Sequence, residues 1–198
     1  MQQDEKFAVP TWEQIYAMLL NLAQRIRKDK FKPDVIVGVS RGGWTPARVM
    51  SDLLENPEIA NVKAEFYLGV AKTKKEPIIT QSVSVDVKCR KVLVVDDVSD
   101  TGRSLRLVRE HLLEEGAEEL RVATLYYKPW SVTVPDYYVK ITRDWVIFPW
   151  ERKEAFRKVV EKFVQKGKSV DDAVETLVKH GFDRKLAKRF SEELKDTL

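Results

Sequence analysis

The sequence contains few of the residues that build disulfide frameworks and structural metal sites. Among its 198 residues are one cysteine, Cys89, and two histidines, His111 and His180. A single thiol excludes an internal disulfide, and one cysteine with two histidines cannot supply the four ligands of a structural zinc site. We therefore expect these three residues to take no part in the chemistry.

Long hydrophobic runs are also missing. No stretch approaches the roughly 18 uncharged apolar residues that a membrane span needs. The longest apolar segments, such as residues 35–39 and 92–95, have the length of strands. The opening residues, MQQDEK, are acidic where a secretory leader is basic, and no apolar segment follows them. The sequence thus favours a cytoplasmic protein with no membrane partner.

The charge is unevenly distributed along the chain. Hydrophobic residues make up 43% and charged residues 33% of the sequence, which is apolar enough to bury a core. Residues 152–198 carry 13 Lys and Arg against 9 Asp and Glu, so they account for the whole net charge of +4. Binding to nucleic acid would have to depend on this tail alone, and we consider nucleic acid an improbable partner.

Apolar strands alternate with amphipathic helices over most of the chain. Thr11 and Gln14 form a predicted capping box, after which apolar residues recur at helical spacing to residue 30. Alternation of this kind predicts an α/β fold of three layers with a mainly parallel sheet. The expected strands are residues 35–39, 62–70, 82–87, 92–95, 121–127 and 137–141, and further helices begin at Pro46 and near Ser104.

After Glu151 the pattern becomes helical only. Three apolar stripes are separated at Gly167 and Gly181, and Ser169 and Asp183 are placed as N-caps. We therefore expect two domains, residues 1–151 and a C-terminal three-helix appendage of residues 152–198.

The strongest chemical signal is the segment VLVVDDVSDTGRS at residues 92–104. An apolar strand delivers two carboxylates, Asp96 and Asp97, to its carboxyl end, where open α/β sheets bind ligands. The turn that follows leaves backbone N–H groups free at the start of the next helix, an arrangement suited to phosphate. Carboxylates for sugar hydroxyls beside amides for phosphate indicate a ribose 5-phosphate.

This segment resembles the PRPP-binding motif of the type I phosphoribosyltransferases. The resemblance implies that Asp96 and Asp97 hold the ribose hydroxyls, directly or through Mg²⁺, for which they are the candidate metal ligands. It also implies a 5-phosphate loop consisting of Asp100, Thr101, Gly102, Arg103 and Ser104. A receiver-like domain, or any strand that ends in acidic residues, also has an acid pair after an apolar strand. In a receiver, however, the pair lies near the start of the chain and the phospho-acceptor lies on a later strand, and neither feature occurs here. A nucleotide-binding P-loop is excluded, because the sequence has no G-x-x-x-x-G-K-[ST] motif and no G-x-G-x-x-G motif follows a strand.

The turn at residues 40–43 is the second signal. Arg41 and the amides of Gly42 and Gly43 suit a multiply charged pyrophosphate. With Ser40 they resemble the pyrophosphate loop of the family, in which the Ser40–Arg41 peptide is expected to be a strained, non-proline cis linkage. Alone, a Gly-Gly pair after a strand also fits a plain tight connection.

The segment after residue 125 resembles the base-binding end of the 6-oxopurine branch, the hypoxanthine, guanine and xanthine transferases. By that resemblance Lys128 donates to the purine O6, Trp145 stacks on the ring and the backbone of Val146 reads the pyrimidine edge. Glu151 lines the same pocket. Trp150 fits the pocket floor and plain core packing equally, and we expect Trp44 and Trp130 to pack.

The expected reaction is transfer of the phosphoribosyl group from PRPP to N9 of a purine. Asp100 exchanges the proton at N7, Arg41 and Mg²⁺ stabilise the leaving pyrophosphate, and residues 71–81 occupy the place of a mobile loop. Two interpretations of this loop region stay open. Its residues contact pyrophosphate, or they form a solvated run of charges; the residues concerned are Tyr67, Lys72, Lys74 and Lys75. The resemblance also implies a homodimer.

The identity of the purine base is a separate question. A cationic Lys128 favours a carbonyl at C6, hence a 6-oxopurine. The resemblance spans residues 10–151, and archaeal relatives with a similar C-terminal bundle use adenine on this scaffold. A third reading keeps the fold without catalysis, as a PRPP-sensing regulator that binds nucleic acid through the basic tail. Base-dependent release of pyrophosphate distinguishes the enzymes from the regulator.

Overall fold

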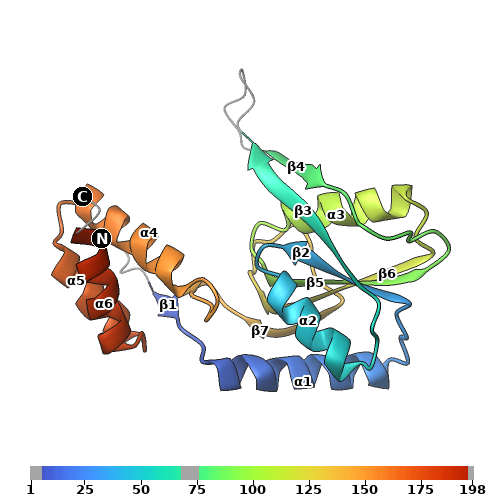
Figure 1. Ribbon diagram of the computed structural model, residues 1–198, viewed down its shortest axis with the longest axis horizontal. Coiled ribbons are helices and arrows are strands. Elements are labelled where there is room, and N and C mark those ends of the chain that lie inside the picture. The colour runs from blue at the N-terminus through green and yellow to red at the C-terminus, as the bar shows by residue number, and fades with distance from the viewer. Residues whose placement is uncertain (1–5, 68–75, 196–198) are drawn as a thin grey trace. The chain divides into compact units, whose positions relative to one another are not determined.

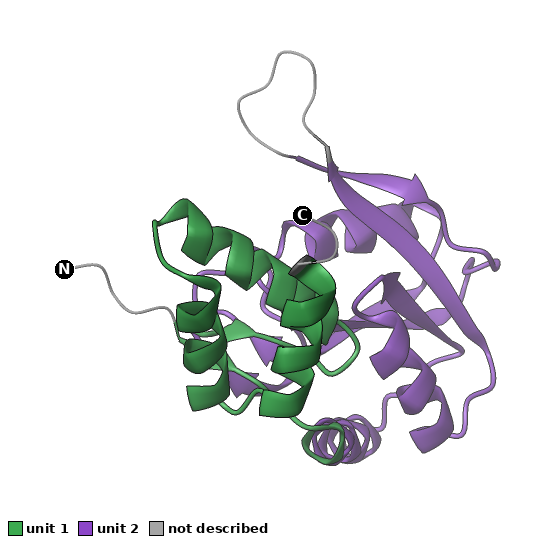
Figure 2. Cartoon of the chain, turned by 60° about the vertical axis from the view of Figure 1, so that its left-hand side comes forward, with its two compact units in different colours: residues 1–14, 144–198 green, residues 15–143 purple. Residues whose placement is uncertain are grey.

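The structure, a computed structural model, describes residues 6–67 and 76–195 (Figure 1). The chain divides into two compact units (Figure 2). We call residues 15–143 the sheet unit, and residues 1–14 with 144–198 the helical unit. Within the described residues, no helix is long and apolar enough to cross a membrane.

The sheet unit contains a six-stranded sheet in the order β4-β3-β2-β5-β6-β7. All neighbouring strands are parallel except β4, which runs antiparallel to β3. The expected α/β fold with a mainly parallel sheet is confirmed. The strands are β2 (Val35–Ser40), β3 (Ile59–Tyr67), β4 (Glu76–Gln81), β5 (Lys91–Ser99), β6 (Glu119–Tyr127) and β7 (Tyr137–Ile141).

Helices cover both faces of this sheet (Figure 1). On one face, α3 (Arg103–Glu114) shares a buried cluster with alternate residues of β2, including Val35 and Val37. On the other, α2 (Trp44–Leu53) approaches Gly38 so closely that a Cβ there would lie 2.9 Å from Ala47 Cβ. Because successive strand residues point to opposite faces, the central strands must be apolar throughout, as residues 35–39 are.

The first helix begins as its sequence predicts. In α1 (Trp12–Lys28), Gln14 N donates to Thr11 Oγ1 at 3.2 Å, and Thr11 N donates to Gln14 Oε1 at 3.0 Å. The capping box is therefore present and satisfies two backbone donors that the helix cannot pair itself. Near the other end of α1, Arg25 donates to the carbonyl of Tyr138, which ties the helix to β7.

One expected strand is absent, and another lies where a loop was expected. Residues 82–87 form no strand, whereas the preceding β4 pairs with β3. The alternation in residues 82–87 arises because Val83, Val85 and Val87 pack on the α3-side core without a neighbouring strand to pair with. Burial on one side is enough to produce a period of two, so the prediction of a strand here is wrong.

The helical unit combines three helices with a short ladder. Strand β1 (Phe7–Ala8) pairs in parallel with β8 (Trp145–Val146). The helices α4 (Arg152–Gln165), α5 (Val170–Lys179) and α6 (Arg184–Lys195) confirm the expected C-terminal three-helix pattern. Both predicted N-caps are present: Asp172 N donates to Ser169 Oγ at 3.1 Å, and Leu186 N donates to Asp183 Oδ1 at 2.7 Å.

The core of the helical unit extends beyond these helices. Phe7 and Ile147 share one buried cluster with Phe156 and Phe163 of α4 and with residues of α5 and α6. The chain passes from one compact unit to the other at residues 14/15 and 143/144. The division into domains of residues 1–151 and 152–198 stays a prediction.

Candidate active site

Two glycine-bearing motifs meet at one edge of the sheet. Strands β2 and β5 are parallel neighbours, with Val35 opposite Val92 and Gly38 opposite Val95. Both strands therefore end at the same edge, where β2 leads into the turn of residues 40–43 and β5 carries the acid pair. The two motifs meet because the carboxyl ends of adjacent parallel strands lie together.

Glycine is required where the turn touches the acid pair. A Cβ on Gly42 would lie 2.1 Å from Asp97 Oδ2, and a Cβ on Gly43 would lie 2.3 Å from the carbonyl oxygen of Val95. No side chain fits at either place, so the absence of one lets the turn lie directly against β5. The Ser40–Arg41 peptide is cis, as expected for this turn.

The acid pair is poorly solvated. Asp97 is 8% exposed and Asp96 is half-buried, and Asp97 N donates to Asp96 Oδ1 at 2.9 Å. Burial, with the neighbouring Asp97 carboxylate as a second cause, raises the pKa of Asp96 well above its ordinary value. Two carboxylates held together at such a cost indicate a site prepared for a cation or for hydroxyl donors.

The turn before α3 has the features of an anion site. Gly102 is left-handed (φ 74°) and caps α3 without a side-chain hydrogen bond. A Cβ at Gly102 would lie 2.3 Å from Ser131 Oγ, while Thr133 Oγ1 donates to the Gly102 carbonyl at 2.7 Å. The turn is thus held from behind. Gly102 offers no side-chain acceptor to the first amides of α3, and Arg103 N donates over a long 3.5 Å to Thr101 Oγ1.

Arg103, placed in the phosphate loop by the sequence, has an acidic neighbour. Its Nη1 lies 3.6 Å from Glu76 Oε1 at the start of β4, and both side chains are exposed. An exposed pair of this kind contributes little stability and dissociates easily. Arg103 can therefore exchange Glu76 for a phosphate without a large penalty.

The turn of residues 40–43 is bordered by β3. Asn61 Nδ2 donates to Ser40 Oγ at 3.2 Å. Hydrogen bonds from Thr80 and Lys63 lower the pKa of Glu65, and the charge of Arg41 lowers it further. Sequence analysis did not single out Asn61 or Glu65, because with Lys63 they form the alternating polar positions of an ordinary strand.

The segment after β6 connects the candidate base-binding lysine to the phosphate turn. Lys128 is only 5% exposed, and its backbone N donates to the Ser99 carbonyl at 3.0 Å. Val132 N donates to the carbonyl of Thr101 at 3.0 Å. Trp130 Nε1 donates to Asp100 Oδ1 at 3.2 Å, which makes this residue part of the site. The sequence-based expectation that Trp130 only packs is therefore wrong.

Three expected base-binding residues belong to the helical unit. The ring centre of Trp145 lies 5.9 Å from the ring centre of Phe7 and 5.8 Å from Lys162 Nζ. Val146 is buried and pairs with Ala8, and Glu151 precedes α4. Because Lys128 lies in the sheet unit, a base pocket shared by all four residues stays a prediction.

Trp150 is packed between aromatic rings. It stacks on Phe148, with ring centres 4.9 Å apart and an interplanar angle of 9°, and the ring centre of Trp12 lies 5.7 Å from that of Trp150. Its buried indole N–H has no hydrogen-bond partner among the described residues. These contacts favour the core-packing alternative for Trp150.

Part of the expected mobile loop cannot be compared. Lys72, Lys74 and Lys75 lie outside the described residues, as does the side chain of Tyr67. In the part of the chain that the structure describes, no group of three or more His, Cys, Asp or Glu side chains could hold a metal ion. The pair Asp96 and Asp97 thus remains the candidate for Mg²⁺, which proteins hold with one or two carboxylates together with substrate phosphates.

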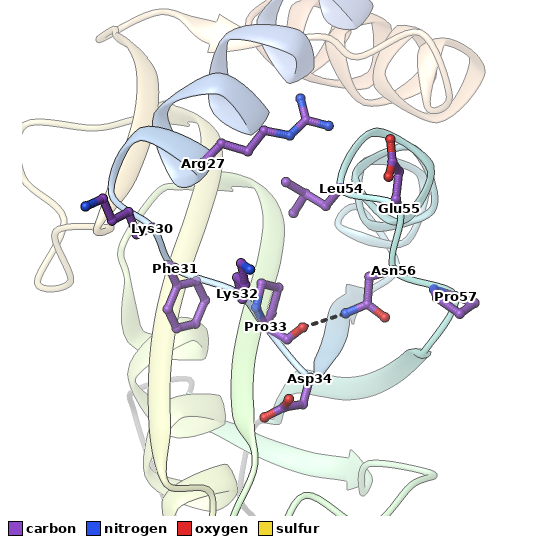
Figure 3. Close-up of a pocket in the computed structure, with 10 residues that line it drawn as sticks. All are labelled: Arg27, Lys30, Phe31, Lys32, Pro33, Asp34, Leu54, Glu55, Asn56 and Pro57. Carbon is purple, nitrogen blue, oxygen red and sulfur yellow. Dashed lines mark hydrogen bonds between the residues drawn. The ribbon is translucent and has the colours of Figure 1, made fainter.

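A separate cavity of about 610 Å³ lies at the opposite edge of the sheet (Figure 3). Asp34 on its wall precedes β2 and Pro57 precedes β3, so the cavity is at the amino ends of the strands. It has no paired carboxylates and no glycine-bearing turn. Its lining is Arg27, Lys30, Phe31, Lys32, Pro33, Asp34, Leu54, Glu55, Asn56 and Pro57.

The chain is similar to a family of known proteins. Residues 11–157 match the family model described as Phosphoribosyl transferase domain. A xanthine-guanine phosphoribosyltransferase of Gluconobacter oxydans (strain 621H) is 31% identical over 156 residues, 78% of this chain and 90% of the relative. A hypoxanthine-guanine phosphoribosyltransferase of Streptococcus pyogenes serotype M3 (strain ATCC BAA-595 / MGAS315) is 26% identical over 150 residues, 75% of this chain and 81% of the relative.

One solved structure has a higher sequence identity to this chain than these two relatives. The purine phosphoribosyltransferase of Pyrococcus horikoshii Ot3 is 41% identical, with a TM-score of 0.67 over 73% of this chain and 93% of that one. The archaeal origin suggested by the C-terminal helices stays a prediction.

Proposed function

Because the chain belongs to the phosphoribosyl transferase domain family, we propose that it is a purine phosphoribosyltransferase of nucleotide salvage. It transfers the 5-phosphoribosyl group of PRPP to N9 of a free purine and releases pyrophosphate. The observation that carries this proposal is the contact of Gly42 with Asp97, which brings an arginine-bearing turn and an acid pair within one ligand's reach.

Each end of PRPP has a matching set of groups. The first amides of α3, where the N-cap residue is a glycine, suit the 5-phosphate together with Thr101, Gly102, Arg103 and Ser104. The Ser40–Gly43 turn, with the Arg41 guanidinium, suits the pyrophosphate. Asp96 and Asp97 lie between these two turns and suit the ribose hydroxyls.

The donor set at Asp96 and Asp97 fits Mg²⁺. A cation or a hydroxyl donor bound at Asp96 favours its ionised form, which desolvation and the Asp97 charge otherwise disfavour. When bound with PRPP, Mg²⁺ neutralises charge on the pyrophosphate. The protein's own residues orient the sugar and hold its hydroxyls.

The transfer step breaks the C1–O bond of PRPP and forms a C1–N9 bond. Positive charge develops on the sugar, next to the two carboxylates, while Arg41 and the turn amides bind the departing pyrophosphate. As N9 attacks, the purine loses its N7 proton to Asp100, which is exposed at the entrance of the phosphate turn. The electron pair of the broken bond leaves with the pyrophosphate.

A 6-oxopurine is the favoured base. A Lys128 ammonium is a donor only and matches the carbonyl at C6, whereas the amino group of adenine would oppose donor to donor. Mispaired donors in a buried position discriminate strongly, and Lys128 is buried. The relatives named for xanthine, guanine and hypoxanthine support this choice. For Trp145, Val146 and Glu151, contact with the base is proposed from the family resemblance alone.

The experiment supplies PRPP and Mg²⁺ to the full chain with adenine, hypoxanthine, guanine or xanthine in turn. We expect nucleoside monophosphate and pyrophosphate with the 6-oxopurines, and adenine slower by 100-fold or more. Asp97→Asn is expected to lose the activity, whereas the exposed helical control Asp52→Asn retains it. Faster turnover of adenine overturns the base assignment. No product with any purine, together with salt-dependent nucleic acid binding, favours the regulator.

We also propose that the enzyme works as a cytoplasmic homodimer. Light scattering of the purified chain is expected to give twice its mass of 23.0 kDa. A monomer at assay concentration contradicts this proposal and leaves the assignment of the reaction intact.

A further inference from the structure

Trp130 contacts the two side chains to which the proposed reaction gives proton transfer and base recognition. Its indole N–H donates to Asp100 Oδ1 at 3.2 Å, and its ring centre lies 5.5 Å from Lys128 Nζ. The Arg143 guanidinium carbon lies 5.9 Å from the same ring centre. All four residues belong to the sheet unit.

These contacts do not serve core packing. Trp130 is 49% exposed, so it buries little apolar surface. The segment that carries it is held by its own backbone and by small side chains. Lys128 N donates to the Ser99 carbonyl, and Thr133 Oγ1 donates to the Gly102 carbonyl. The segment keeps its place without the indole, which is therefore available for the surface groups around it.

We propose that Trp130 is a positioning residue that sets the spacing between Asp100 and Lys128 so that both face one edge of the purine. This inference rests on the proposed function. N7 and O6 are neighbours on a 6-oxopurine, so the base and the donor that serve them must also be held near each other. A planar side chain with one N–H and two cation-binding faces can hold a carboxylate and an ammonium at once.

The indole N–H and the ring have separable roles. The N–H fixes Asp100 through Oδ1, which leaves Oδ2 to accept the N7 proton. The ring face attracts the ammonium of Lys128, and the contact with Arg143 restrains the ring. Loss of the N–H therefore affects the proton transfer step, and loss of the ring also affects binding of the base.

Two substitutions separate these roles. Trp130→Phe keeps a ring but loses the donor, and we expect kcat to fall about tenfold, equivalent to about 1.4 kcal/mol of barrier, with KM for hypoxanthine within about twofold. Trp130→Leu loses both and is expected to raise KM for hypoxanthine as well. Trp12→Phe, which alters a tryptophan of similar exposure (51%), is the matched control with wild-type kinetics.

A double-mutant cycle tests whether Trp130 acts through Asp100. Asp100→Asn keeps the Oδ1 acceptor but cannot exchange the proton, so adding Trp130→Phe to it is expected to change kcat by less than about twofold. The proposal is overturned if Trp130→Phe alone leaves kcat unchanged, if it lowers kcat equally in both backgrounds, or if the variant melts at the assay temperature. Absence of transfer in the wild-type chain instead overturns the proposed function.

Discussion

At the scale of single residues, the site depends on two positions without a side chain as well as on its carboxylates. Gly42 and Gly43 leave space that the acid pair and the β5 backbone occupy. Asp96 is held where burial and a like charge disfavour its ionised form. The close packing of the turn and the raised pKa are two consequences of bringing β2 and β5 together at their carboxyl ends. Each consequence can be tested by one substitution.

Gly42→Ala is expected to weaken PRPP binding by about tenfold or more. The added Cβ falls 2.1 Å from Asp97 Oδ2, so either the turn or the carboxylate must move. Overpacking of this kind also lowers the free energy of unfolding by about 1–3 kcal/mol. Titration calorimetry with Mg²⁺–PRPP and urea denaturation measure the two effects.

Gly167→Ala is the control for this substitution. Gly167 is left-handed (φ 73°), but nothing lies within 4 Å of the added Cβ. It should lose about 1 kcal/mol of stability from backbone strain while PRPP affinity is unchanged. Equal loss of affinity in both variants would show that the Gly42 contact has no special role.

Asp96→Asn is expected to stabilise the protein at neutral pH while abolishing PRPP binding. The folded-state pKa of Asp96 lies above the unfolded value, so its ionisation costs stability as pH rises through the folded pKa. The variant has no such loss, so its advantage in unfolding free energy should be near zero below about pH 4 and largest above the folded-state pKa of Asp96. Thermal melts across this range measure it. A variant equally or less stable than wild type at pH 7 contradicts the account.

At the scale of elements, the sequence predicted those whose signal is local. Thr11 forms the predicted capping box and Ser169 is the predicted N-cap, because their partners are three residues away. Residues 82–87 were misassigned because a strand also needs a neighbouring strand, which a period of two does not reveal. Trp130 was missed because its partner Asp100 is distant in sequence, on the turn after β5.

Ser169→Ala tests the contribution of a cap to the helical unit. The Ser169 hydroxyl accepts from Asp172 N at the start of α5, so its loss should cost about 1 kcal/mol of unfolding free energy. Ser191→Ala removes a hydroxyl that only donates back to the Ala187 carbonyl within α6, and should cost less than about 0.5 kcal/mol. Chemical denaturation compares them, and a larger loss in Ser191→Ala would contradict the assignment.

At the scale of the whole chain, the sequence showed where helices replace strands but not where the compact units meet. Phe7 and Ile147 precede the helices in sequence yet share their buried cluster. Composition changes at Glu151, whereas packing is decided by residues far apart in the chain. A mainly parallel sheet was predictable, whereas the convergence of the two motifs depends on the strand order, in which β2 lies beside β5. The base pocket was not predictable, because its expected residues fall in two units.

Truncation after Glu151 is expected to destabilise the protein strongly. Removing α4–α6 exposes Phe7 and Ile147, which are now buried. Loss of a whole core face exceeds the marginal stability of about 5–15 kcal/mol available to a domain. We expect a shortened chain that is insoluble or melts well below the full chain. A soluble fragment with an unchanged melting temperature would instead support the domain division expected from the sequence.

The central claim is that the Ser40–Gly43 turn and the Asp96–Ser104 segment hold PRPP by both ends. A crystal structure of the full chain with Mg²⁺ and PRPP tests it most directly. We predict ribose hydroxyls within about 3 Å of Asp96 and Asp97 or of a metal ion they bind, the 5-phosphate on the first amides of α3, and the pyrophosphate beside Arg41. A sugar bound away from these aspartates would contradict the account.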